Sequence, residues 1–317
     1  MPNETTTTTL NDLTHASLVQ PVLIRALSEH PGLFRFCREF NIVDQPTNAA
    51  SIPTETSYWG SANDDGAGVD TEFNATEATS LSNTAFSTGA VTCTASEFGV
   101  AHALIDNTVE DSVRGIDIMD MIKGRMLFVH MLAWEDDFLA QFANLSQTVG
   151  STGVDLTVAQ MIAAQQGLRV RGVESDALVY VLDNQQTIDV EAALVAASTS
   201  AAVFALSADR LINYAPSPDN GMGATRNVMT FRGLPVYGTG LTDTANTGAD
   251  VVGACFAPST AFNDATGATT YAVAWKRLPM FETQRQAKLR GSDLVMTARL
   301  GFAELQDGSG TGIITDA

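Results

Sequence analysis

The chain has 317 residues, of which 45% are hydrophobic and 17% charged, and its formal net charge is −19. This composition allows one large domain with lobes or two modest ones, and it excludes a long disordered protein. The acidic balance argues against a general nucleic-acid binder and against attachment to an anionic membrane, because both need a basic face. No apolar run approaches the roughly 20 residues of a membrane span, and the acidic, threonine-rich start is not a signal peptide.

Residues 1–53 are expected to form an extended arm interrupted by one helix. The threonine run at 5–9 has little to bury and should be mobile alone. A short helix is expected at 21–29, and an apolar patch containing Phe34 and Phe36 follows it. An arm of this kind needs another surface to cover.

Residues 54–96 are expected to form a long two-stranded excursion. The segment is rich in small polar residues, and its tip at 63–68 is a strong turn signal. Its large side chains are isolated, and they include Tyr58, Trp59, Phe73 and Phe86. Because an isolated ribbon is marginally stable in water, it needs a partner, which could be a neighbouring subunit.

Charge is divided unevenly along the chain. No lysine or arginine occurs between residues 39 and 113, so the excursion is purely acidic. A basic cluster lies near the C-terminus and comprises Lys276, Arg277, Arg285, Lys288, Arg290 and Arg299. We hypothesise that the acidic loop of one subunit lies over the basic strands of the next, the alternative being ordinary solvated charges.

Residues 107–147 carry the clearest periodic signal and predict a long helix. Apolar residues at steps of three and four form one stripe, and a second stripe runs along the other side. The first stripe comprises Val109, Val113, Ile116, Leu127, Met131, Trp134, Phe138, Phe142 and Leu145, and the second Ile118, Ile122, Met126, Val129 and Ala133. A helix of this length would measure roughly 55–60 Å. Two stripes indicate that its middle is covered on both sides.

The remaining chain predicts a compact α/β lobe followed by antiparallel strands. In the lobe we expect helices at 156–166 and 187–206, buried strands at 177–182 and 251–257, and a hairpin at 227–239. Beyond it we expect strands at 271–275, 280–286 and 293–305, with a turn at 290–292 and a glycine-rich tail containing Ile313 and Ile314.

Residues with catalytic or metal-binding potential form no recognisable constellation. The four histidines are scattered, and no GxSxG, HExxH or Walker motif occurs. The three cysteines are far apart and odd in number, which favours buried free thiols in a reducing cytosol. The triplet Glu135-Asp136-Asp137 is best interpreted as a solvated or interface face, and the oxygen-rich loop at 63–70 as a plain turn rather than a calcium site. We therefore expect no catalytic, cofactor-binding or metal site.

The order of these parts resembles the major capsid proteins of tailed bacteriophages, which have the α+β Hong Kong-97-type fold. The resemblance covers nearly the whole chain and rests on order and lengths more than on any single motif. It is carried by Ile52-Pro53, the helix at 108–147, the strand at 178–182 with its following helix, and the segments 231–237, 255–258 and 296–303. It implies an N-terminal arm at 1–53, an E-loop at 54–96, a P-domain with the spine helix at 97–153, an A-domain at 154–260 and closing P-domain strands at 261–317. Some members join an E-loop lysine to a neighbouring asparagine, but this loop contains no lysine, and a long N-terminal scaffolding segment is also missing.

The resemblance implies a structural protein, not an enzyme, that self-assembles as hexamers and pentamers into an icosahedral shell. Such a shell is built in the host cytoplasm, becomes part of the virion and encloses double-stranded DNA without sequence-specific binding. Portal, scaffolding and cement or decoration proteins would be partners, and no membrane or cofactor would be involved. The expected intersubunit contacts are Leu10, Leu13, Phe34, Phe36, Tyr58, Trp59, Phe73, Phe86, Arg285 and Lys288. Alternatives are an encapsulin-like nanocompartment with the same fold, an enzyme with an unfamiliar α/β lobe, and a fibrous surface protein.

Overall fold

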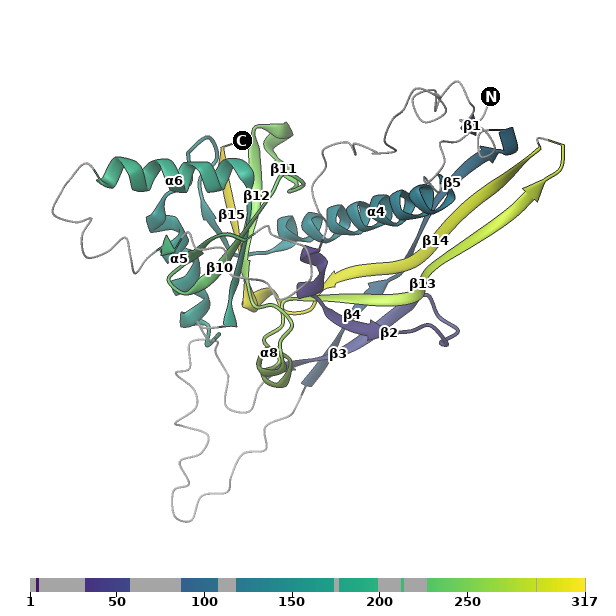
Figure 1. The fold of residues 1–317 in the computed structure, drawn as a ribbon. Coiled ribbons are helices and arrows are strands. Elements are labelled where there is room, and N and C mark those ends of the chain that lie inside the picture. Colours follow the sequence, from purple (N-terminus) through teal and green to yellow (C-terminus); the bar gives the residue numbers. More distant parts are fainter. Residues whose placement is uncertain are drawn as a thin grey trace, which may run out of the picture.

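The computed structural model describes residues 4–5, 32–57, 87–107, 118–173, 177–198, 212–213, 227–288 and 290–316. They form a five-stranded sheet, an eight-stranded sheet and a separate two-stranded ribbon (Figure 1). The five-stranded sheet has the order β1-β5-β14-β13-β2. Its strands are β1 (Glu4–Thr5), β5 (Ser96–Ile105), β14 (Gly291–Glu304), β13 (Tyr271–Gln286) and β2 (Arg38–Asn41).

A long antiparallel hairpin of β13 and β14 forms the centre of this sheet. Its register runs from Tyr271 opposite Glu304 to Gln286 opposite Gly291. The two strands expected at 271–275 and 280–286 are one continuous strand, because two register shifts between Trp275 and Met280 absorb the interruption at Pro279. Strand β5 pairs with β14 along its whole length and was not expected from the sequence.

Helix α4 (Ile118–Leu139) lies along one face of the five-stranded sheet and continues as a 3-10 turn, η2 (Ala140–Asn144) (Figure 1). The predicted helix is confirmed over this span, which is about 33 Å long at ~1.5 Å per residue; residues 108–117 lie outside the described residues. The prediction that the middle of this helix is covered on both sides is wrong, because Leu127 and Val129 are 39% and 41% exposed. The buried stripe instead crosses from Ile118, Ile122 and Met126 to Trp134, Phe138 and Phe142.

The eight-stranded sheet is built mainly from the α/β lobe. Its principal strands are β7 (Val179–Asp183), β10 (Leu234–Thr239), β9 (Asn227–Phe231), β12 (Asp250–Phe256), β15 (Gly310–Asp316) and β6 (Thr148–Gly150), with the short β8 (Ile212–Asn213) and β11 (Thr244–Ala245) at its margins. Helices α5 (Val158–Val170) and α6 (Asn184–Ser198) pack against it, and the small helix α8 (Ala261–Thr266) follows β12. The hairpin, the two buried strands and both helices are confirmed within the described residues.

One segment belongs to a different sheet from the one expected. Strand β15 pairs with β12 and with β6, so the tail with Ile313 lies in the eight-stranded sheet rather than among the closing strands of the hairpin. The reason is burial: the side chain of Ile313 is fully buried in the core beside α5, which a glycine-rich tail could not reveal in advance.

The chain crosses between the two large sheets at three places, residues 145–147, 257–270 and 305–309, which we call the junction. An aromatic cluster fills its interior, with Phe138, Phe142, Phe256 and Tyr271 in mutual contact at ring-centroid distances of 5.1–6.2 Å. Most of these contacts are edge-to-face, which is a favourable geometry for ring quadrupoles.

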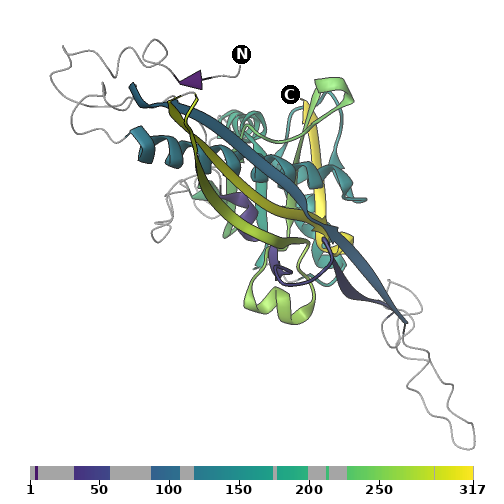
Figure 2. The ribbon, with the colours of Figure 1, turned by 90° about the vertical axis from the view of Figure 1, so that its right-hand side faces the viewer.

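The two-stranded ribbon consists of β3 (Ala49–Ser57) and β4 (Ser87–Thr94), paired from Ala49 opposite Thr94 to Ser57 opposite Ser87. It projects away from the body, as Figure 2 shows, and β4 runs on into β5 with only Ala95 between them. The base of the predicted excursion is therefore confirmed, while residues 58–86 lie outside the described residues. No helix among the described residues is long and apolar enough to cross a membrane.

Candidate assembly surfaces

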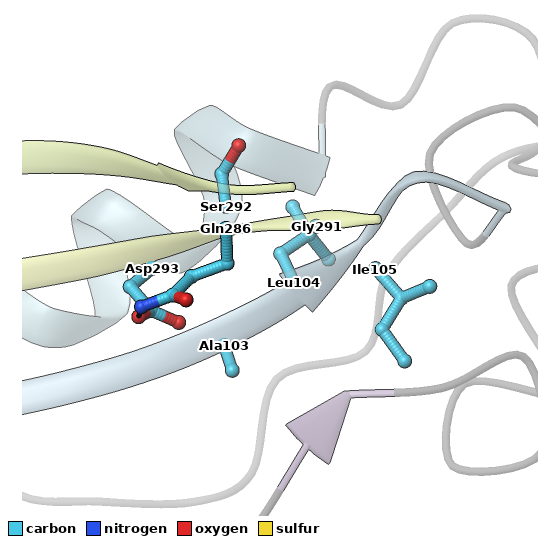
Figure 3. Close-up of a pocket in the computed structure, with 7 residues that line it drawn as sticks. All are labelled: Ala103, Leu104, Ile105, Gln286, Gly291, Ser292 and Asp293. Carbon is cyan, nitrogen blue, oxygen red and sulfur yellow. Dashed lines mark hydrogen bonds between the residues drawn. The ribbon is translucent and has the colours of Figure 1, made fainter. Parts of the chain in front are cut away.

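A pocket lies at the far end of the β13–β14 hairpin, where it meets β5 (Figure 3). It is lined by Ala103, Leu104, Ile105, Gln286, Gly291, Ser292 and Asp293. Two of its polar side chains bind each other, since Gln286 Nε2 donates to Asp293 Oδ2 at 2.7 Å. The described residues also contain no group of three or more histidine, cysteine or carboxylate side chains that could hold a metal. The candidate functional sites are therefore surfaces.

The base of the ribbon is the first such surface, and its direction is fixed by close packing. Gly301 of β14 lies directly under β4, where a Cβ atom would be 2.0 Å from the Thr94 carbonyl oxygen. The Cys93 thiol donates to the Gly301 carbonyl oxygen at 3.1 Å, and burial raises the pKa of this thiol. Ile52 and Ala50 join the same buried cluster. The ribbon therefore leaves the sheet as a docked element rather than as a free hairpin.

The outer edge of β13 is the second surface. Strand β2 pairs with β13 only over Ala272–Trp275, and no strand among the described residues continues along residues 276–286, which we call the open edge. Leu278 and Met280 on this edge are 60% and 45% exposed. Soluble proteins usually protect such edges, because an unpaired strand can bind another chain.

The predicted basic cluster borders the open edge, but half of it is already engaged inside the chain. Arg277 donates to Glu97 at 2.7 Å, and Lys276 donates to the carbonyl oxygens of Ile42, Val43 and Gln45. Arg285 forms a two-point ion pair with Asp106, and this bond lowers the pKa of the carboxyl and raises that of the guanidinium.

Lys288 lies beyond β13 in the turn before β14 and is exposed. Of the two predicted contact residues in this region, Arg285 thus has a partner in its own chain, and Lys288 faces solvent.

The two predicted arm contacts within the described residues pack on their own chain. Phe34 meets Trp134 edge-to-face at a centroid distance of 6.0 Å, and Phe36 lies 5.2 Å from Tyr237 and 6.2 Å from Phe256. Both side chains are half-buried. The other predicted contacts, Leu10, Leu13, Tyr58, Trp59, Phe73 and Phe86, lie outside the described residues.

Glu135 is an anchoring residue that the sequence did not reveal. Its carboxylate accepts backbone N–H groups from Gly32 and Leu33, the second at 3.0 Å, and it is fully buried. The expected solvated face is therefore wrong for Glu135, although Asp136 and Asp137 are exposed. The partners lie about 100 residues away in the sequence, so no local pattern could have indicated them. We call Gly32 and Leu33 the arm exit, because Glu135 holds this part of the predicted arm against α4.

Comparison of the sequence with protein-family models and with curated proteins gives no match. The structure, in contrast, is similar to capsid subunits along nearly its whole length. The acid-stable capsid of Helicobacter pylori bacteriophage KHP30 has 12% identity and a TM-score of 0.62, covering 97% of this chain and 96% of that one. The capsid of cyanophage P-SCSP1u has 11% identity and a TM-score of 0.61, covering 96% and 94%. The SrpI encapsulin of Synechococcus elongatus PCC 7942 has 7% identity and a TM-score of 0.58, covering 92% of each chain.

These likenesses confirm the expected α+β fold of the Hong Kong-97 type. The likeness extends over more than nine tenths of each chain. At such low identity the agreement concerns the fold, and it comes from the arrangement of sheets and helix rather than from shared side chains.

Proposed function

We propose that this chain is the major capsid protein of a tailed phage, a subunit that assembles into an icosahedral shell around double-stranded DNA. The observation that carries the proposal is the combination of this fold with a ribbon docked on β13 and β14 and an open edge farther along β13. Among the described residues of a single subunit, the ribbon and the open edge lack a further strand partner, and each could be covered by a neighbouring copy of the chain.

The proposed interface brings the ribbon of one subunit over the open edge of the next. The span 39–113 carries no lysine or arginine, whereas Lys288 and Arg290 lie exposed at the end of the hairpin. Opposite charges of this kind steer association and fix its register. Leu278 and Met280 would supply apolar area, and Tyr58, Trp59, Phe73 and Phe86 are the proposed aromatic contacts from the ribbon. Leu10, Leu13, Phe34 and Phe36 are the proposed contacts of the arm.

The proposed role is structural rather than enzymatic. In this role, residues 1–53 would act as the arm and 54–96 as the E-loop. Residues 97–153 with 261–309 would form the P-domain, and 154–260 with β15 the A-domain. The subunits would be grouped as hexamers and pentamers. The net charge of −19 suits a shell whose inner wall holds DNA loosely. Portal, scaffolding and cement proteins are proposed partners, and the virion is the proposed location.

Electron microscopy of the purified chain tests the proposal directly. Closed shells support it, and a persistent compact monomer at high concentration contradicts it. Shells that enclose a protein cargo instead of DNA in the native source would favour the encapsulin-like alternative, which the weaker SrpI likeness does not favour over a phage capsid.

Charge and deletion variants then test the proposed interface. Lys288→Glu should impair closure without altering thermal unfolding, because this exposed side chain lies beyond the paired strands. The matched control is the double swap Arg285→Asp with Asp106→Arg at the same end of the hairpin. It can retain the ion pair inside the chain, so it changes local charges without changing the net charge. Deletion of residues 60–85 should leave a folded chain that forms no closed shells; closed shells from the deletion would exclude the ribbon from the interface.

A further inference from the structure

We propose that Glu304 and Asp307 form a proton-controlled tie between the two large sheets. Glu304 is the last residue of β14, and Asp307 begins the short 3-10 turn η5 (Asp307–Ser309) that leads into β15. Asp307 therefore lies on one of the three crossings of the junction, and Glu304 directly precedes that crossing. The inference concerns the subunit itself and does not depend on the proposed function.

Asp307 joins two crossings of the junction. Its carboxylate accepts the Ser146 backbone N–H at 2.8 Å and also the Ser146 hydroxyl, so it holds the segment that leads from η2 into β6. A side-chain hydrogen bond joins it to Glu304. Asp307 is thus held by the hydroxyl and the amide of Ser146, which lies on another crossing, and by the carboxyl of Glu304 at the end of β14.

Among the described residues, the hydrogen bonds between the crossings 257–270 and 305–309 come from groups that do not titrate, although the Asp264 carboxylate accepts bonds from Ser259 and Thr269 inside the first of them. Leu305 N donates to the Thr270 carbonyl oxygen at 2.7 Å, and the Thr270 hydroxyl donates to the Ser309 carbonyl oxygen at 2.9 Å. Ala257 N also donates to the Ser309 carbonyl oxygen at 3.1 Å. These bonds keep residues 257–270 and 305–309 together at any pH, so a change of protonation acts on the tie to Ser146.

Two carboxyl groups that share a hydrogen bond hold one proton between them, because both cannot ionise at low cost. Burial, followed by the charge of Asp307 and the bond to it, raises the pKa of Glu304 to about 7. Burial acts in the same direction on Asp307, but the two bonds from Ser146, the bond from Glu304 and the charge of Arg171 outweigh it and lower its pKa. Glu304 is therefore the proton donor of the pair.

The surroundings contain no second base among the described groups that face the pair. Arg171, the C-cap residue of α5, donates to Gly310 O at 3.2 Å and to the Thr311 hydroxyl at 2.6 Å, which places its positive charge near Asp307. Tyr271 lies opposite Glu304 on β13 and keeps its proton, since burial raises the pKa of its hydroxyl well above the ordinary value. Burial does the same for the nearby Cys37 thiol.

The direction of the effect follows from these pKa values. The folded chain holds the Glu304 proton more strongly than the unfolded chain, in which the group titrates near 4.5. Stability should therefore decline as the pH rises from that value through about 7. Above this range both carboxylates are charged and repel each other, which displaces Asp307 from Ser146.

Hydrogen exchange of the full chain, corrected for the intrinsic pH dependence of amide exchange, tests the inference. Between pH 5.5 and 8.5, peptides covering 145–150 and 305–310 should exchange several-fold faster at the higher pH, with a midpoint near 7. Glu304→Gln should abolish the dependence, because its amide stays neutral and can still donate to Asp307. Glu282→Gln, an exposed position on β13, is the matched control and should behave as the unmodified chain does.

Asp307→Asn is a second variant, which distinguishes loss of the interaction between the two carboxyl groups from general destabilisation of the junction. It removes the like charge while leaving an oxygen to accept the Ser146 amide, so the midpoint should move to lower pH. A pH-independent exchange of the junction in the unmodified chain, or an unchanged midpoint in both variants, would overturn the inference.

Discussion

Replacing Gly301 with alanine should detach the base of the ribbon from the sheet. The new Cβ would lie 2.0 Å from the Thr94 carbonyl oxygen and 2.7 Å from its carbonyl carbon. An ordinary carbon–oxygen contact needs about 3.3 Å, so β4 would have to move by roughly 1.3 Å. No side-chain rotation can relieve the overlap, because the opposing atoms belong to the backbone.

The cost of this substitution has two parts. Overpacking a tight position costs roughly 1–3 kcal/mol. The displacement also lengthens the bond from Cys93 to the Gly301 carbonyl and opens the small apolar cluster around Ile52, which adds about 1 kcal/mol. We expect a total near 3 kcal/mol and a fall in Tm of about 6 °C, at roughly 2 °C per kcal/mol for a large domain.

Calorimetry and hydrogen exchange across 49–57 and 87–94 measure this effect. Gly99→Ala on the neighbouring strand β5 is a matched control, since its Cβ would lie at ordinary contact distances, 3.7 Å from the Thr297 methyl and 4.0 Å from the Met296 carbonyl oxygen. Gly124→Ala on α4 meets nothing within 4 Å and should stabilise the chain by about 1 kcal/mol. Unchanged melting and exchange in Gly301→Ala would refute the close docking of the ribbon on β14.

Three further variants or probes address the interior. Glu135→Gln replaces a charged acceptor by a neutral one and should destabilise the chain by about 1 kcal/mol, seen as faster limited proteolysis near the arm exit, whereas Asp136→Asn should have no effect because Asp136 is exposed. Gln186→Leu removes buried bonds to Asp183, Ile313 and Thr315 and should cost about 2–3 kcal/mol in urea unfolding, while Gln185→Leu at the exposed neighbour should stay within about 0.5 kcal/mol. The three cysteines should react with a thiol reagent at pH 8 far more slowly in the native chain than in urea, because all are buried and burial raises their pKa values, that of Cys255 to about 12. Rapid labelling of the native chain would contradict their placement.

Regular periodicity in the sequence predicted the elements whose side chains face a single core. The α4 stripe ending in Phe138 and Phe142 and the β9–β10 hairpin are of this kind, because local spacing decides which side chains are buried. Strand β5 also carries such a signal in Phe98, Val100 and Leu104. The small residues between them weakened the alternation, and the strand was missed.

Long-range pairing accounts for what the sequence did not reveal. The burial of Glu135 depends on amides of the arm exit, and the place of β15 depends on β6 and β12. The surface predictions were limited in the same way: the engagement of Arg285 by Asp106 requires the end of β5 to meet the end of β13, which composition and charge do not specify.

The position of β15 affects how the chain is synthesised. This strand lies inside the eight-stranded sheet, between β12 and β6, although β6 is translated much earlier. On the ribosome, the hydrogen-bonding groups of β12 that face β15 stay unpaired until residue 316 has been made, and pairing across such sequence distances is slow. A polypeptide that ends upstream of β15 therefore leaves this side of β12 without its strand partner and lacks the Ile313 side chain in the core beside α5.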